Sequence, residues 1–114
     1  MFKVGNKYSV QEMTNGEFHM AYDNFYAVID GKFEEIAMWR DSVMDEAMSE
    51  NPELTEEEAY KDAMEDVIFH IPSTYEGCKE AAVFVGIPPV GPGKGFDFYS
   101  EYECVDVWRE DSEK

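Results

Sequence analysis

Apolar residues recur at helical spacing in two segments of the middle of the chain. Over 33–48 they fall three or four positions apart, which predicts an amphipathic helix closed by the asparagine-proline pair at 51–52. A second helix is predicted to begin at Thr55, because Thr55 and Glu58 have the spacing of a capping box. In this motif each side chain accepts a hydrogen bond from the backbone N–H of the other residue. Its apolar stripe runs to Pro72, where we expect the helix to end because proline lacks a backbone donor.

The first thirty residues fit two structures. Segments 7–13 and 17–22 flank an Asn-Gly pair, which is typical of a β-hairpin, and 25–29 followed by Asp-Gly predicts a further strand and turn. The same region also fits one face of a helix, with Thr14 and Glu17 as its cap. The density of Phe, Tyr, Val and Ile favours the strands.

Two strands are predicted in the last third of the chain. Residues 81–85 form a short apolar run typical of a buried strand. Residues 96–108 alternate, but the apolar phase changes partway, which indicates a bulge or a bend. Between them, 86–95 contains three prolines and four glycines and is interpreted as a structural connector, or alternatively as a partner-binding loop that presents Ile87 and Val90.

Together these elements predict an α+β fold, an antiparallel β-sheet packed against two acidic amphipathic helices. The length of 114 residues suits a single domain over 1–114, with fraying over 110–114. The sequence has no long apolar run and no signal peptide, so we expect a cytoplasmic protein that does not span a membrane. In that compartment Cys78 and Cys104 are expected as reduced thiols; the alternative is a single disulfide between them.

Charge changes the picture from fold to function. The formal net charge is −17, and residues 34–66 alone carry thirteen acids against two bases. Residues 97–114 carry seven acids against two bases. Such a chain is not expected to bind nucleic acid or an anionic membrane directly, because phosphate contacts require Lys and Arg. The expected partner is a basic protein surface, such as that of a nucleic-acid-binding enzyme or defence complex.

Carboxylates are predicted to form rows on both helices. An i, i+4 step rises about 6 Å along a helix, close to the spacing of phosphates in a nucleic-acid strand. The alternative interpretation is an ordinary solvated helix face, although such faces normally interleave Lys with the acids. The predicted partner-binding acids are Glu34, Asp41 and Asp45 on the first helix and Glu58, Asp62 and Glu65 on the second.

Three further acids and one tryptophan complete the candidate surface. Glu101, Glu103 and Asp106 form a secondary acidic stretch in the last predicted strand. Trp39 lies off the main apolar stripe of its helix, so it is either an interface anchor or packed under the sheet.

No recognised catalytic or metal-binding pattern is found. His19 and Asp23 have i, i+4 spacing but do not form a metal motif, and the glycines near Lys94 do not match a phosphate-binding loop. We therefore expect no enzyme activity, no metal and no cofactor.

In composition alone, the chain resembles the phage-encoded DNA-mimic proteins, which include anti-restriction and anti-CRISPR inhibitors. Small size, high negative charge and rows of carboxylates carry this resemblance. It implies a protein inhibitor that occupies a basic nucleic-acid-binding surface, in host cytoplasm if phage-encoded. The alternatives are an immunity protein that neutralises a basic nuclease toxin and, in another class, a small ligand-binding domain or enzyme without a recognisable motif.

Overall fold

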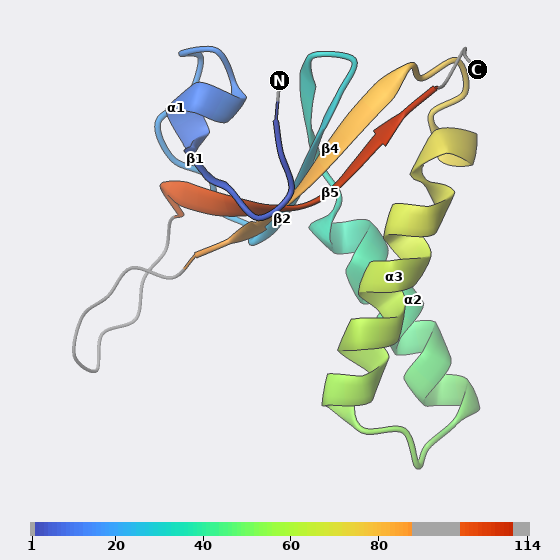
Figure 1. The fold of residues 1–114 in the computed structure, drawn as a ribbon. Helices are drawn as coiled ribbons and strands as arrows, with labels where there is room; N and C mark the ends of the chain where they lie inside the picture. Colours follow the sequence, from blue (N-terminus) through green and yellow to red (C-terminus); the bar gives the residue numbers. More distant parts are fainter. Residues whose placement is uncertain (1, 88–98, 111–114) are drawn as a thin grey trace, which may run out of the picture.

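The computed structural model describes residues 2–87 and 99–110 (Figure 1). Within them lies a five-stranded antiparallel sheet of order β1-β5-β4-β2-β3 with three helices, which confirms the predicted α+β class. The elements in chain order are β1 (Lys7–Ser9), α1 (Val10–Met13), β2 (Phe25–Ile29), β3 (Lys32–Glu35), α2 (Ala37–Glu50), α3 (Glu56–Thr74), β4 (Glu80–Gly86) and β5 (Glu101–Arg109). Most of the predicted connector and of the terminus predicted to fray, at 88–95 and 111–114, lies outside the described residues.

The sheet is covered on both faces. On one face, Val67 and Ile71 of α3 and Ala37 of α2 pack with side chains from β2 and β4. On the other face, Val10 and Met13 of α1 pack with a different set of side chains from the same strands. Successive side chains of a strand point to opposite sides, so the second face draws on other residues of these strands and buries the rings of Tyr26, Phe84 and Tyr102.

The β2–β3 hairpin confirms one prediction and overturns another. The predicted strand at 25–29 is β2, and the Asp30-Gly31 turn has φ angles of 51° and 85°. This turn sends the chain back along β2, so the residues at 32–35 pair as β3 and are not helical. The predicted helix at 33–48 is therefore wrong at its start: α2 begins at Ala37 and runs to Glu50. Phe33 instead stacks on the ring of Tyr26, with centroids 4.3 Å apart.

The N-terminal region confirms only the first three residues of the strand predicted at 7–13, and neither the hairpin nor the alternative helix forms. The chain forms a strand of three residues and then the short helix α1, begun by a capping box between Ser9 and Glu12. Asn15 and Gly16 do adopt positive φ angles, of 58° and 87°, but they follow a helix and do not join two strands. Thr14 holds this turn because its hydroxyl donates to the carbonyl of Val10 and accepts from the N–H of Phe18.

Helix α3 begins as predicted and ends later. The Thr55 hydroxyl accepts from the Glu58 N–H at 3.1 Å, and the Glu58 carboxylate accepts from the Thr55 N–H at 3.1 Å, which confirms the capping box. The prediction that Pro72 ends the helix is wrong, because α3 continues to Thr74. Proline itself lacks a backbone N–H, but the residues after it keep theirs. The Tyr75 N–H therefore still donates to the Ile71 carbonyl at 2.9 Å.

Both C-terminal predictions are confirmed where the residues are described. The apolar run at 81–85 is β4, which pairs with β2 on one side and β5 on the other. The change of phase in β5 is a bulge: Phe84 lies opposite Cys104 and Val83 lies opposite Asp106, so Val105 is the extra residue.

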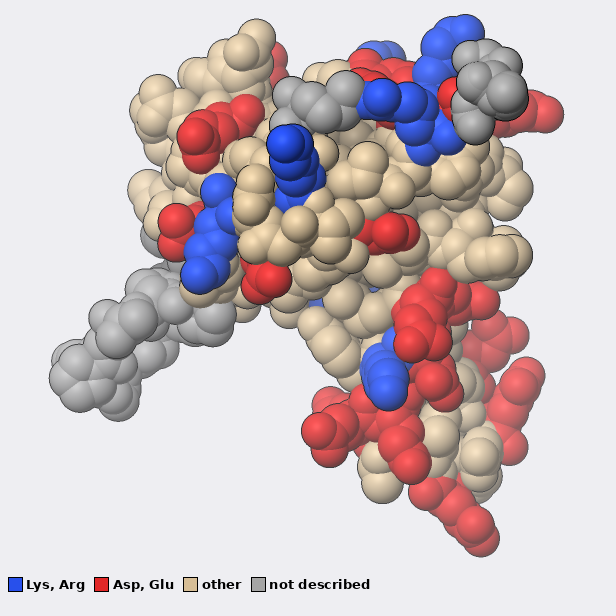
Figure 2. Space-filling view, in the orientation of Figure 1, with Lys and Arg blue, Asp and Glu red and all other residues tan. Residues whose placement is uncertain are grey.

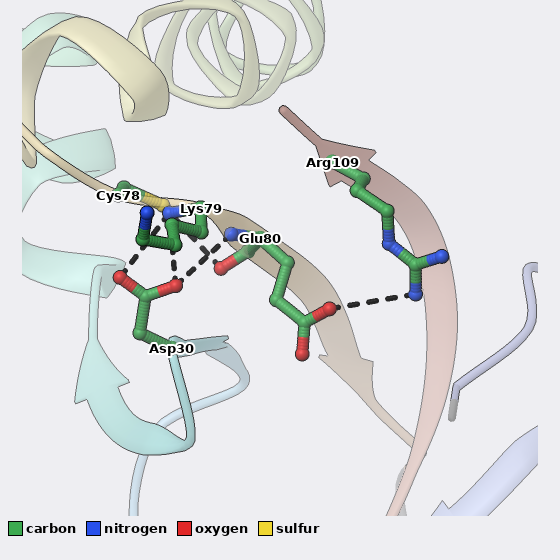
Figure 3. Close-up of polar contacts among 5 residues, drawn as sticks. All are labelled: Asp30, Cys78, Lys79, Glu80 and Arg109. Carbon is green, nitrogen blue, oxygen red and sulfur yellow. Dashed lines mark hydrogen bonds and ion pairs between the residues drawn. The ribbon is translucent and has the colours of Figure 1, made fainter. Parts of the chain in front are cut away.

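Polar contacts tie the start of β4 to the rest of the sheet (Figure 3). The Asp30 carboxylate accepts from the backbone N–H groups of Lys79 and Glu80, at 2.9 and 3.0 Å. On the adjacent strand, the Arg109 guanidinium lies 3.4 Å from the Glu80 carboxylate. These contacts join the β2–β3 turn, the start of β4 and the end of β5.

Helices α2 and α3 form an antiparallel hairpin whose outer half projects beyond the sheet (Figure 1). The inner ends contact the sheet, whereas the outer half of α3 buries the small side chains of Ala59 and Ala63 against α2. Among the described residues, no helix is both long and apolar enough to cross a membrane.

Candidate protein-binding surface

The projecting hairpin concentrates negative charge. Residues 37–74, which comprise α2, α3 and their connection, carry eleven acids against two bases, a net charge of −9 out of −17. Figure 2 shows many acidic side chains on the face of the hairpin seen in this view, whereas the visible Lys and Arg side chains gather mainly on the sheet. The hairpin therefore has the highest density of negative charge, since the other 76 residues carry only the remaining −8.

The predicted row on the first helix is only partly present. Glu34 belongs to β3, so it cannot share a helix face with Asp41 and Asp45; that part of the prediction is wrong because the Asp30-Gly31 turn extends the chain. Glu34 instead lies near Tyr75, whose pKa is raised by burial and, to a smaller extent, by this carboxylate. Asp45 is exposed on α2.

Asp41 is partly neutralised by its neighbour Arg40. The Arg40 guanidinium lies 2.8 Å from the Asp41 carboxylate and donates to the Asn24 side-chain oxygen at 2.9 Å. It also lies over the rings of Phe25 and Tyr60, with its central carbon 5.6 and 5.1 Å from their centroids. Arg40 thus joins α2 to α3 and the sheet, and Asp41 contributes less negative charge than its exposure suggests.

The predicted row on the second helix is present on α3. Glu58 is engaged in the capping box, so its carboxylate is directed back toward the first turn. Asp62 and Glu65 are exposed one turn apart, and Asp66 extends the row, 3.4 Å from the ring of His70. Within the described part of the chain, Asp62 and Glu65 have no Lys or Arg partner at ion-pair distance.

Trp39 takes the second of its two predicted roles. It is half-buried and packs against the core between the helices and the sheet. The exposed large apolar residues of the hairpin are instead Met38, at 71% exposure, and Phe69, at 78%.

An apolar groove lies between α3 and β5. Its volume is about 520 Å³, and it brings Glu65 of the predicted helix row beside Asp106 of the predicted secondary stretch. The groove is lined by Glu65, Ile68, Phe69 and Pro72 of α3 and by Asp106, Val107 and Trp108 of β5. An adjoining surface hollow is lined by Asp62, Glu65, Asp66 and Phe69, so acids surround one side of the exposed Phe69 ring.

Sequence reasoning missed Phe69 and Trp108 as surface residues. The sequence does contain a signal for Phe69: it directly follows Ile68 and is not part of the apolar stripe, which indicates an apolar side chain on the outer face of the helix. The remaining predicted acids, Glu101 and Glu103, are exposed at the other end of β5, where they pair in register with Ser9 and Lys7 of β1.

The two cysteines carry no surface chemistry. Cys78 and Cys104 are unbonded and buried, one in the core on each face of the sheet. Burial raises the pKa of both thiols, which disfavours the reactive thiolate. Among the described residues, no group of three His, Cys, Asp or Glu side chains is arranged to hold a metal ion.

The geometry defines an α+β protein with an acidic, partly apolar surface on its helical hairpin. No protein-family model, curated protein or solved structure matches the chain.

Proposed function

We propose that this protein is a small acidic inhibitor that occupies the basic nucleic-acid-binding surface of another protein, in the manner of a DNA mimic. A phage counter-defence protein of the anti-restriction or anti-CRISPR type fits this description. The observation that carries the proposal is the concentration of negative charge on one projecting element: 38 residues of the hairpin carry a net charge of −9. A projecting element can enter a cleft that a flat charged surface cannot reach.

The mechanism requires no catalysis. The acidic hairpin steers the protein toward a basic cleft, since complementary charge accelerates diffusional encounter. Exposed carboxylates on α2 and α3 then take positions that phosphates would occupy. Asp45 and Glu46 on α2 and Asp62 on α3 are candidates, because all three are exposed and none has an ion-pair partner among the described residues.

A matched charge-reversal experiment tests the proposal. The tagged protein is expressed in cells with candidate defence nucleases, the captured protein is identified, and its affinity is measured with purified components. We expect the triple variant Asp45→Lys, Glu46→Lys and Asp62→Lys to weaken binding by at least about a hundredfold, because three charge pairs become repulsive. The control triple variant Glu17→Lys, Glu35→Lys and Glu76→Lys makes the same charge change at exposed positions outside the hairpin.

The same complex should respond to salt and to nucleic acid. Added NaCl should weaken it, and duplex DNA should compete for the partner, because both act on the basic cleft. Equal loss in the two triple variants, or a partner that binds no nucleic acid, would contradict the proposal. So would a specific submicromolar complex between this protein and DNA or RNA.

A further inference from the structure

The outer edge of β5 lacks a neighbouring strand over its second half. Strand β4 pairs with β5 along its whole length, but β1 pairs only with Glu101–Glu103, and the contact continues no further than Cys104. Within residues 2–87 and 99–110, no strand therefore covers 105–109 on the side away from β4. An uncovered edge is a template for another extended chain.

The register shows which backbone groups face outward. The Glu110 N–H donates to the Lys79 carbonyl, so these two residues form a hydrogen-bonded pair. In an antiparallel ladder, hydrogen-bonded pairs recur every two residues. Trp108 opposite Ala81 therefore exchanges hydrogen bonds with β4, and Val107 beside it directs its N–H and C=O away from β4. The edge thus offers a backbone donor and acceptor next to the groove.

The groove supplies an apolar contact beside this edge. Phe69 is 78% exposed and lines the groove together with Trp108, which is half-buried. A strand added to β5 would direct alternate side chains toward the helix layer, where apolar ones would cover the Phe69 ring. This addition would remove from water the largest exposed aromatic surface of the hairpin.

Acidic side chains around the groove favour a basic binding partner. Glu65 and Asp106 line the groove, and Asp62 and Asp66 lie in the adjoining hollow. The neighbouring His70 and Arg109 side chains contact other acids: the His70 ring lies 3.4 Å from the Asp66 carboxylate, and the Arg109 guanidinium lies against Glu80. A second copy of this chain would bring the same acids against these, whereas a segment with Lys or Arg would complement them.

We propose that the β5 edge and its groove dock an extended segment of a partner protein whose helix-facing side chains, at every second position, include both apolar residues and Lys or Arg. The segment pairs with β5 through Val107, places its apolar side chains on Phe69 and Trp108, and directs its cations to Glu65 and Asp106. This site goes beyond the proposed function, because it does not require that the partner bind nucleic acid.

Peptide titrations test the site. The probe is a fluorescent, acetylated heptapeptide whose odd positions are alternately lysine and valine and whose even positions are threonine, so that one face of the strand carries both contacts. Its binding to the full protein is followed by anisotropy. We expect Phe69→Ala and Glu65→Lys each to weaken binding at least about tenfold, the effect typical of an interface anchor. Met38→Ala and Glu17→Lys are the matched controls, since they remove an exposed apolar residue of α2 and reverse an exposed acid outside the hairpin.

Two further measurements separate strand addition from non-specific attraction and from self-association. A peptide of the same sequence with alternate backbone nitrogens methylated should lose binding, because it cannot donate to β5. Equal binding of the methylated peptide, or equal loss in the control variants, overturns the proposal in favour of non-specific attraction. A dimer in sedimentation that Phe69→Ala dissociates overturns it in favour of a second copy. Loss of partner binding in the double variant Asp45→Lys and Glu46→Lys, whose two positions lie on α2 outside the groove and the hollow, tests the proposed function separately.

Discussion

The sheet buries large apolar side chains on both faces, whereas the outer half of the α2–α3 hairpin buries alanines and exposes carboxylates. Phe25, Phe84 and Tyr102 are fully buried in the sheet. In α2, the buried residues are Ala37 and Arg40, both near the end that contacts the sheet. This difference indicates that the sheet supplies most of the stability, while the hairpin is held out from it with its charge available for a partner.

The largest expected effect is in the sheet. Phe84→Ala should lower the free energy of unfolding by about 3–5 kcal/mol, because it empties a fully buried site beside the rings of Phe2 and Tyr8. Met48→Ala, at a half-buried position of the outer hairpin, should cost below about 1 kcal/mol. Urea denaturation of both variants measures the difference, and comparable losses would show that the hairpin contributes as much as the sheet.

The next effect is at the junction of the two regions. Arg40→Met should cost about 1–3 kcal/mol, because it removes the donor to Asn24 and the partner of Asp41. Lys61→Met is the control, since it removes the same charge from an exposed position of the hairpin. If the two variants melt alike, the role of Arg40 is general charge neutralisation, and the junction contacts are unimportant.

A smaller effect is expected at the start of α3. Thr55→Ala should destabilise the protein by about 1 kcal/mol, because the Glu58 N–H loses its side-chain acceptor. Hydrogen exchange should show the loss of protection in the first turn of α3 and not in the sheet. Thr74→Ala, at the other end of the same helix, is the control. Faster exchange throughout the sheet in Thr55→Ala would mean that the two regions unfold together.

The buried thiols of the sheet should have the smallest effect on the free energy of unfolding near neutral pH, and their effect should appear only in alkali. Burial raises the folded-state pKa of Cys78 and Cys104 above the ordinary value of 9.0. The unfolded chain therefore ionises first, so this contribution to stability is complete below about pH 8.5 and is lost as pH rises through the folded-state values. Denaturation at pH 7.5 and pH 10.5 measures the loss, and replacement of both cysteines by alanine should reduce it. If the variant without cysteines loses as much stability at pH 10.5 as the original protein, the loss comes from the buried tyrosines.

Elements with a local signal were predictable from the sequence. Helix α3 carries its own capping box at Thr55, β2 ends in an Asp-Gly turn, and β5 shows its bulge as a change of apolar phase. Strand β3 was missed because its residues fit a helical stripe, and only pairing with β2 makes them extended.

The candidate site was predicted in its parts and not in its arrangement. Asp62, Glu65 and Asp106 were identified as acids of two separate segments, and their proximity depends on how α3 lies beside β5. The partial neutralisation of Asp41 depends on the side-chain contacts of Arg40, which local spacing does not specify.

The bulge at Val105 has a consequence for insertions and deletions. Loss of one residue from a regular strand inverts every side chain beyond it, because the two faces alternate. At Val105 the chain already holds one residue more than its partner strand, so deletion there would restore even pairing and leave Trp108 facing the helices. The same deletion at Val107 would turn Trp108 to the opposite face. Among homologous chains, length changes in β5 are therefore expected at position 105.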